Sequence, residues 1–388
     1  MNKAGIALLA LSGMVVPQVA TAAPQPRPDR AVLQRDADHL LDLGAPGVLV
    51  ELTTPTGSAK VRAGYADTTA RTPVPWDAHF RIGSSTKTFT ATVLLQLVGE
   101  GRLSLEDAVD RWLPGVVAGN GNDGAKITVR QLLQHTSGLP EYLQAEDMAF
   151  LGSAEGFQAD RFRNFTGSEL VAMAMTLPPV FAPGADWSYS NTNYVLAGMI
   201  IKRITGHDWN SEVRTRIIEP LHLDDTTAPH VMPFLIGAHA TGYALFAPDG
   251  PAIDATALSP SWAGAAGAIV SDTADLSTFL RALLGGRLLR PAQLAEMRKT
   301  VPATPLDPIW PGARYGLGLV WIPTSCGGYW SHGGDIPGFK TRNGVSADGR
   351  TSVVITMNGD PLVPKEGTPP PQHDHSVDII EHAFCGTS

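Results

Sequence analysis

The stretch RIGSSTKTFT, residues 81–90, places a serine and a lysine three positions apart, at Ser84 and Lys87. In a helix that begins at about Ser84, positions i and i+3 share a face, so the two side chains meet while Ser85 points elsewhere. The helix is apolar around much of its circumference, which predicts that it is buried. Burial lowers the pKa of a lysine, and a neutral Lys87 can accept the proton of Ser84. The pair therefore predicts nucleophilic catalysis through an acyl-enzyme on Ser84.

Two further motifs follow along the chain. Tyr189 and Asn191 form a Tyr-x-Asn motif just before an apolar helical stretch, and a His-Gly-Gly motif begins at His332 on a predicted strand. Ser-x-x-Lys, Tyr-x-Asn and basic-x-Gly, in that order, resemble the motifs of the penicillin-recognising serine hydrolases, most closely the secreted D-alanyl-D-alanine carboxypeptidases and the class C-like β-lactamases and esterases. The likeness extends along the mature chain, through FRIGSSTKTFTATVLLQLVGEGRLSL, ITVRQLLQHTSGLP, YSNTNYVLAGMIIKRITG, SWAGAAGAIVS, YGLGL and AFCG.

Acyl transfer needs a nucleophile, a base that later serves as an acid, and donors for the oxyanion. With Ser84 as nucleophile and Lys87 as base, Tyr189 is expected to shuttle the proton to the leaving group. For this the pKa of Tyr189 must fall, and the cationic neighbours Lys87 and His332 are expected to lower it. Asn191 is expected to hold Lys87 and to donate to the acyl amide of the substrate.

The resemblance also implies the parts that surround the reacting bond. It implies an oxyanion hole made by the backbone N–H groups of Ser84 and Asp335. Gly334 would let the substrate backbone approach the strand closely. Trp262 resembles the aromatic wall of the family's cleft, and a buried core tryptophan is the alternative interpretation.

Two residues depart from the carboxypeptidase pattern. Carboxypeptidases of this subgroup bind the terminal carboxylate of the peptide with a hydroxyl residue beside the glycine of the third motif and with an arginine after GLGL. Asp335 and Val320 stand at these positions here. An ionised Asp335 facing the substrate would repel a carboxylate and attract an ammonium. If Asp335 points away, only its backbone matters.

We predict a secreted serine hydrolase, most similar to a penicillin-binding D-alanyl-D-alanine carboxypeptidase, that acts on a small peptide, ester or β-lactam-like substrate. The alternatives are an esterase, or a D-amino-acid amidase or aminopeptidase of the same family. A non-catalytic module that binds peptidoglycan or β-lactams is disfavoured because the serine, lysine and tyrosine are all present. No cofactor is expected. No metal is expected either, although His373, His375 and His382 lie close together near the C-terminus.

The predicted elements indicate an α+β fold of the β-lactamase/transpeptidase type. Strand patterns occupy both ends of the chain, as a hairpin over 46–66 and three strands over 314–323, 327–349 and 350–358. Helical patterns lie between them, and a last helix covers 376–385. We therefore expect an antiparallel sheet built from both termini and flanked by helices, with a mostly helical subdomain inserted over roughly 105–260.

The ends of the chain and its composition predict its compartment. Residues 1–22 have a lysine, a short apolar run and an Ala-Thr-Ala pattern, as in a cleaved secretory signal, and 23–388 would form one catalytic domain. In an oxidising compartment, Cys326 and Cys385 are expected to form a disulfide. The formal charge of −8 disfavours binding to nucleic acid. We expect no membrane anchor and a monomeric protein.

Overall fold

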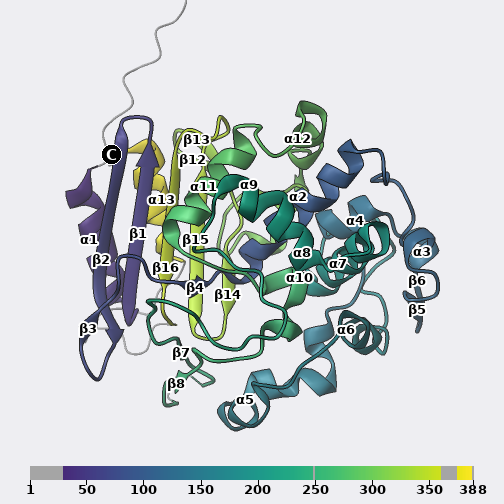
Figure 1. Cartoon of the computed structure of the whole chain (residues 1–388), viewed down its shortest axis with the longest axis horizontal. Coiled ribbons are helices and arrows are strands. Elements are labelled where there is room, and N and C mark those ends of the chain that lie inside the picture. The colour runs from purple at the N-terminus through teal and green to yellow at the C-terminus, as the bar shows by residue number, and fades with distance from the viewer. Residues whose placement is uncertain (1–28, 248–249, 360–373, 387–388) are drawn as a thin grey trace, which may run out of the picture.

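The computed structural model describes residues 29–247, 250–359 and 374–386. It is built on a ten-stranded sheet in the order β10-β11-β12-β13-β15-β16-β1-β2-β3, with β14 paired to β15. Figure 1 shows the sheet in one half of the molecule and most of the helices in the other. The strands of this sheet are β1 (Gly47–Thr54), β2 (Gly57–Asp67), β3 (Thr72–Pro73), β10 (Val301–Pro302), β11 (Arg314–Tyr315), β12 (Val320–Thr324), β13 (Gly327–Ser331), β14 (Gly334–Ile336), β15 (Phe339–Val345) and β16 (Ser352–Met357).

The helices and the short strand pairs fill most of the remaining chain. The α-helices are α1 (Arg30–Asp42), α2 (Thr86–Gly99), α3 (Val109–Trp112), α4 (Val129–Gln134), α5 (Ala154–Asp160), α6 (Gly167–Ala174), α7 (Asn191–Thr205), α8 (Trp209–Val213), α9 (Glu219–Leu221), α10 (Gly264–Gly267), α11 (Thr273–Leu284), α12 (Pro291–Met297) and α13 (Ser376–Cys385). The two-residue pairs are β4 (Phe80–Arg81) with β9 (Val270–Ser271), β5 (Ala118–Gly119) with β6 (Asn122–Asp123), and β7 (Tyr243–Ala244) with β8 (Ile253–Asp254).

Both ends of the chain contribute to the sheet, as predicted. β1 and β2 form the expected hairpin, and β1 also pairs antiparallel with β16, so that Val48 lies opposite Met357. The stretch predicted as one strand over 327–349 instead forms three strands. β13 and β14 run in the same direction with a break at His332 and Gly333, and the chain then reverses once, at Pro337 and Gly338, into β15, which pairs antiparallel with both. The α+β fold with an antiparallel sheet is therefore confirmed.

The two faces of β1 pack against different helices. Val48, Val50 and Leu52 point into a core shared with α1 and α13. Glu51 points to the opposite face, where its carboxylate accepts a hydrogen bond of 2.6 Å from Thr273 at the start of α11. This alternation is the period of two expected of a strand, and it places the sheet between two helical layers. The sequence analysis predicted α13 but not α1.

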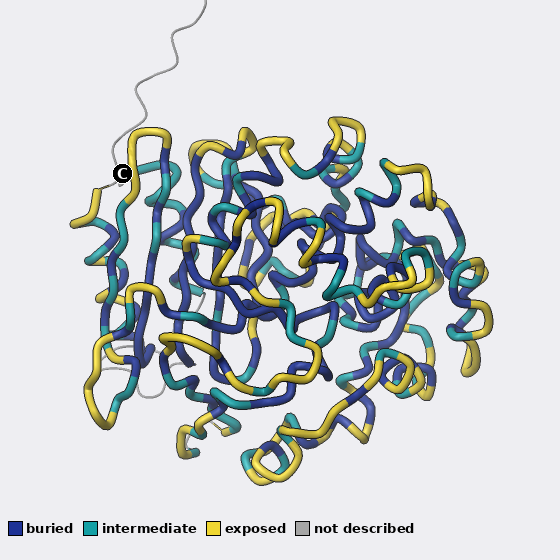
Figure 2. Tube along the Cα trace, viewed as in Figure 1, coloured by how far each residue is buried: buried dark blue, intermediate teal, exposed yellow. Residues whose placement is uncertain are grey.

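Helix α2 is the buried helix that follows the Ser-x-x-Lys motif. Nearly all of its residues are buried, as predicted, and its path is dark in Figure 2. The expected start at Ser84 is wrong in detail, because a 3-10 turn over Gly83–Ser85 precedes the α-helix, which begins at Thr86. Gly83 has a φ of 50°, a left-handed conformation that an α-helix does not accommodate. Ser84 therefore lies in a tight turn at the entrance of α2.

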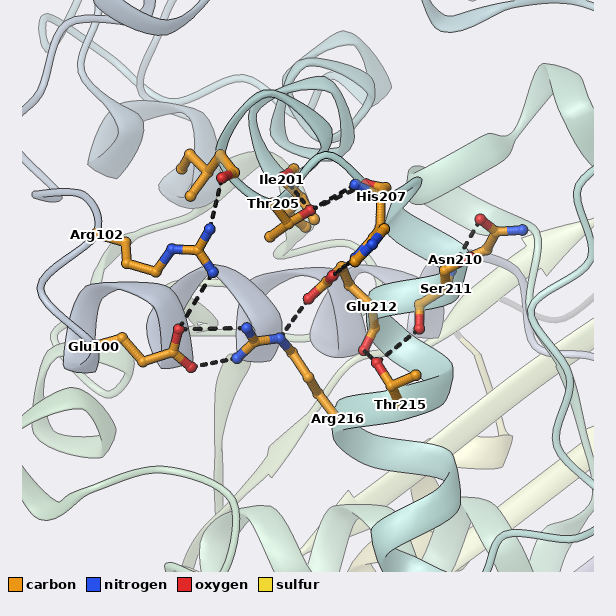
Figure 3. Close-up of polar contacts among 11 residues, drawn as sticks. Glu100, Arg102, Ile201, Thr205, His207, Asn210, Ser211, Glu212, Thr215 and Arg216 are labelled. Carbon is orange, nitrogen blue, oxygen red and sulfur yellow. Dashed lines mark hydrogen bonds and ion pairs between the residues drawn. The ribbon is translucent and has the colours of Figure 1, made fainter.

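The far ends of α2 and α7 are joined by charged side chains (Figure 3). Arg216 lies in a π-helical turn that continues α8; it donates to Glu212 at 2.5 Å and pairs with Glu100 just after α2. Arg102 donates at 2.6 Å to the carbonyl of Ile204 near the end of α7. These contacts connect the end of α2 to α7 and to α8, at the ends opposite to Ser84 and Asn191.

One prediction about the start of the chain and one about its subdivision stay predictions. The signal sequence at 1–22 lies outside the described residues. Helices α3 to α9 occur in the range 105–260, and its status as a separate subdomain stays a prediction. None of the helices in the described part of the chain is long and apolar enough to cross a membrane.

The predicted disulfide is present between Cys326, in the turn after β12, and Cys385, the last residue of α13, with a sequence separation of 59. Replacing both cysteines by serine is expected to lower the free energy of unfolding by about 4 kcal/mol, because the unfolded chain regains the entropy of an open loop. Denaturant unfolding followed by circular dichroism measures this loss. An unchanged midpoint in the double variant would mean that the bridge does not stabilise the fold.

Candidate active site

Ser84 and Lys87 meet at the entrance of α2. The Nζ of Lys87 lies 3.0 Å from the Oγ of Ser84, 2.6 Å from the Oδ1 of Asn191 and 2.8 Å from the carbonyl oxygen of Ala266. A neutral amine has two N–H groups and one lone pair. With its N–H groups donated to Asn191 and Ala266, the lone pair of Lys87 faces the Ser84 hydroxyl, as proton transfer requires.

Burial makes Lys87 suitable for this role. Its side chain is 0% exposed. Desolvation lowers the pKa of Lys87 to about 7, and the carboxylate of Glu141 acts in the opposite direction by raising it. The direction predicted from the apolar helix is therefore confirmed.

Glu141 is a part of the site that the sequence analysis missed. Its Oε2 accepts hydrogen bonds from the backbone N of Asn191 at 2.6 Å and from its Nδ2 at 3.0 Å. These bonds turn the Oδ1 of Asn191 toward Lys87. Burial raises the pKa of Glu141, and hydrogen bonds from Asn191 and Leu143 and the charge of Lys87 oppose this. In the sequence, Glu141 directly follows the family-like segment ITVRQLLQHTSGLP, and this position is the only local indication of its role.

Ser85 is turned away from Lys87, as predicted, although it lies in the 3-10 turn before α2. Its Oγ donates to the carbonyl oxygen of His332 at 2.5 Å and accepts from the Nδ2 of Asn343 at 3.2 Å. Ser85 therefore joins the turn that carries Ser84 to the strands that follow His332.

Tyr189 lies over Lys87, with the Nζ of Lys87 4.8 Å from the ring centroid. The prediction of a lowered pKa is wrong: burial raises the pKa of Tyr189 well above its ordinary value, although a hydrogen bond with Ser84 acts to lower it. Tyr189 therefore keeps its proton and can serve the site as a hydrogen-bond donor. The rings of Tyr189 and His135 lie 4.3 Å apart, and the Nδ1 of His135 accepts from the backbone N of Ser190, so the turn at His135 positions this segment.

His332 is buried and uncharged. It lies between β13 and β14, where its Nδ1 is 2.8 Å from the carbonyl oxygen of Gly333 and its Nε2 is 2.7 Å from the hydroxyl of Tyr315. Burial, together with the charge of Lys87, lowers the pKa of His332 to about 3. The expectation of a cationic His332 is therefore wrong. Nδ1–H donates to Gly333 and Nε2 accepts from Tyr315, a partner that the sequence analysis did not single out.

Gly334 permits a close approach of β14 to the turn at Ser84. A Cβ atom on Gly334 would lie 2.0 Å from the carbonyl oxygen of Ile82 and 2.6 Å from the backbone N of Ser84. A Cβ atom on Gly83 would lie 3.0 Å from the backbone N of Asp335. The amides of Ser84 and Asp335 thus lie in backbone segments that touch, a proximity that an oxyanion hole shared by the two amides needs.

A cavity of about 360 Å³ opens onto Ser84. Its polar residues include Ser84, Asn191, Asp335 and Lys340, and its apolar walls include Leu143, Leu151, Phe246, Trp262, Ile336 and Phe339. Trp262 fits both interpretations offered by the sequence, because it lines this cavity while being only 7% exposed. Asp335 is on the cavity wall and pairs with Arg342, whereas Val320 is buried in β12.

The sequence matches the family described as Beta-lactamase over residues 29–375. The chain belongs to the β-lactamase family. Its members are serine hydrolases, so the chain is an enzyme of that class, and the resemblance to penicillin-recognising hydrolases is confirmed.

Two solved structures are similar to this protein over nearly the whole of its chain. A D-stereospecific amidohydrolase from Streptomyces sp. is 42% identical, with a TM-score of 0.84, over 93% of this chain and 100% of that one. A D-amino acid amidase from Ochrobactrum anthropi SV3 is 30% identical, with a TM-score of 0.76, over 91% of this chain and 96% of that one. Penicillin-binding protein 4* of Bacillus subtilis is 34% identical over 184 residues, which are 46% of this chain and 38% of that protein.

Proposed function

We propose that the chain is a serine amidase that hydrolyses D-amino-acid amides through an acyl-enzyme on Ser84. The observation that carries this proposal is the cavity wall beside Ser84, where Asp335 offers a carboxylate to the α-ammonium of a substrate. The apolar walls suit an apolar or aromatic side chain. The likeness to a D-stereospecific amidohydrolase and a D-amino acid amidase supports the choice of the D configuration.

The proposed reaction uses groups already placed around Ser84. The Oγ of Ser84 attacks the amide carbonyl carbon while Lys87 takes its proton, and the backbone N–H groups of Ser84 and Asp335 bind the oxyanion. The C–N bond then breaks, and the leaving amine receives the proton that Lys87 took from Ser84, while the hydroxyl of Tyr189 keeps its own proton and acts as a hydrogen-bond donor. Water hydrolyses the resulting ester, with the proton again accepted by Lys87. Asn191 and Glu141 hold Lys87 in place.

The test is the hydrolysis of D-phenylalanine amide, L-phenylalanine amide and a peptide ending in D-Ala-D-Ala. We expect turnover of the D-amide, a preference of at least about tenfold over the L-amide, which corresponds to roughly 1.4 kcal/mol in the transition state, and slower release of D-alanine from the peptide. Cleavage of the peptide without turnover of either amide would overturn the proposal.

A D-alanyl-D-alanine carboxypeptidase is the second candidate, and was the function favoured by the sequence alone. It is supported by Lys340, which lines the same cavity and could attract a carboxylate. The partial match to penicillin-binding protein 4* points the same way. The full-length likeness to amidases and the acid at Asp335 lead us to place it second.

We also propose that the protein is exported after removal of residues 1–22. The disulfide between Cys326 and Cys385 supports this, because such bonds persist outside the reducing cytoplasm. Sequencing the N-terminus of the mature protein in the culture medium tests the proposal, and a chain retained in the cell with Met1 in place would contradict it.

A further inference from the structure

Arg342 connects the cavity to a residue outside it. Arg342 lies on β15, and its side chain is 5% exposed. Its Nη1 donates to the Oδ1 of Asp335 at 2.9 Å and its Nη2 to the Oδ2 at 3.3 Å, while its Nε donates to the Oδ2 of Asp374 at 2.6 Å. One guanidinium is therefore shared between two carboxylates.

The two carboxylates lie in different surroundings. The side chain of Asp335 is 57% exposed and lines the cavity that contains Ser84. The side chain of Asp374 is 18% exposed, is absent from the cavity wall, and accepts a hydrogen bond at 3.1 Å from the backbone N of Ser376 at the start of α13. Asp374 thus contacts Arg342 outside the cavity, while Asp335 contacts the same guanidinium from the cavity wall.

The net charge of Asp335, Arg342 and Asp374 determines the electrostatic potential at this wall of the cavity. Two carboxylates and one guanidinium leave one net negative charge, and the exposed member is Asp335. Without the charge of Asp374, Arg342 would compensate Asp335 fully. Lys340, directly opposite Asp335 on the neighbouring strand, adds a positive charge to the same wall in either case.

We propose that Asp374 is a positioning residue that sets the charge selectivity of the cavity through Arg342, favouring acyl groups that carry an ammonium over those that carry a carboxylate. The substrate preference rests on the proposed function, in which Asp335 binds an α-ammonium. The electrostatic effect requires only that the enzyme forms an acyl-enzyme on Ser84.

The test compares wild type with Asp374→Asn, a change that keeps the shape of the side chain. The substrates are the p-nitrophenyl esters of β-alanine, butyric acid and succinic acid, whose acyl groups have similar length and end in an ammonium, a methyl and a carboxylate. We expect the ratio of kcat/KM for the β-alanine ester to that for the succinate ester to fall on the order of tenfold in the variant. The butyrate ester should change much less, and added salt should reduce the difference between the two proteins.

Asp378→Asn is the matched control, because it removes the same charge four residues further along the chain, where the carboxylate contacts His375 rather than Arg342. Thermal unfolding shows whether Asp374→Asn is folded, and Asp374→Glu, which restores the charge, should return the ratio toward the wild-type value. An unchanged ratio in the folded variant would overturn the inference. Failure of the wild type to hydrolyse D-phenylalanine amide would overturn the proposed function instead, and the ester ratios would still decide the role of Asp374.

Discussion

Replacing Ser84 by alanine is expected to lower kcat by roughly 10⁶-fold, to below detection, because the variant has no hydroxyl to form the acyl-enzyme. Ser85→Ala is the matched control, one residue away in the same turn. It should retain turnover within about tenfold of the wild type and lose about 1–3 kcal/mol of stability, because Ser85 bonds the carbonyl oxygen of His332 rather than Lys87.

Intact-mass spectrometry distinguishes the two serines directly. After brief exposure to a penicillin or to an activated ester, any acyl adduct should appear on the wild type and on Ser85→Ala and be absent from Ser84→Ala. Turnover by Ser84→Ala, or an adduct that survives this change, would refute the assignment of the nucleophile.

The pH dependence of kcat/KM should report the proton on Lys87. Lys87 is the base in its neutral form, and its pKa is lowered to about 7 by burial. Activity should therefore be low while Lys87 is protonated, fall about tenfold for each pH unit below that pKa, and level off above it.

Glu141→Gln should move the acidic limb of the pH profile, the range in which kcat/KM falls, to lower pH. The negative charge of Glu141 raises the pKa of Lys87, so its removal lets burial lower that pKa further. Glutamine keeps an oxygen that can still accept from Asn191. Glu146→Gln, a nearby exposed change, should leave the profile in place. A limb that stays fixed in Glu141→Gln, or moves to higher pH, would show that Lys87 is not the group being titrated.

The sequence predicted the elements whose patterns are local. Helix α2 was recognisable because it is apolar all round, and the hairpin of β1 and β2 because its residues alternate about a short turn. Helix α1 was missed because its apolar positions, such as Leu33 and Leu40, are sparse among charged residues. The direction of the pKa shift of Lys87 followed from its buried helix alone.

The parts of the site that were missed depend on contacts between distant segments. Glu141 accepts hydrogen bonds from Asn191, and Tyr315 is hydrogen-bonded to His332. The spacing of these residues along the chain does not reveal either contact. The wrong charge states of Tyr189 and His332 have the same cause. Burial in the folded protein raises the pKa of Tyr189 and, together with the charge of Lys87, lowers the pKa of His332, and the motifs alone do not reveal either effect.

The pairing of β1 with β16 also bears on how the protein folds. β1 is made early in synthesis, and one of its two partners is available only when nearly all of the chain has been made. Until then the open edge of the β1–β2 hairpin exposes unpaired backbone groups and apolar side chains that could join another chain. Closing so long a loop is entropically slow. The completed sheet, and with it the wall of strands beside Ser84, is therefore a late product of folding, and the new chain depends on being kept apart from its neighbours during that delay.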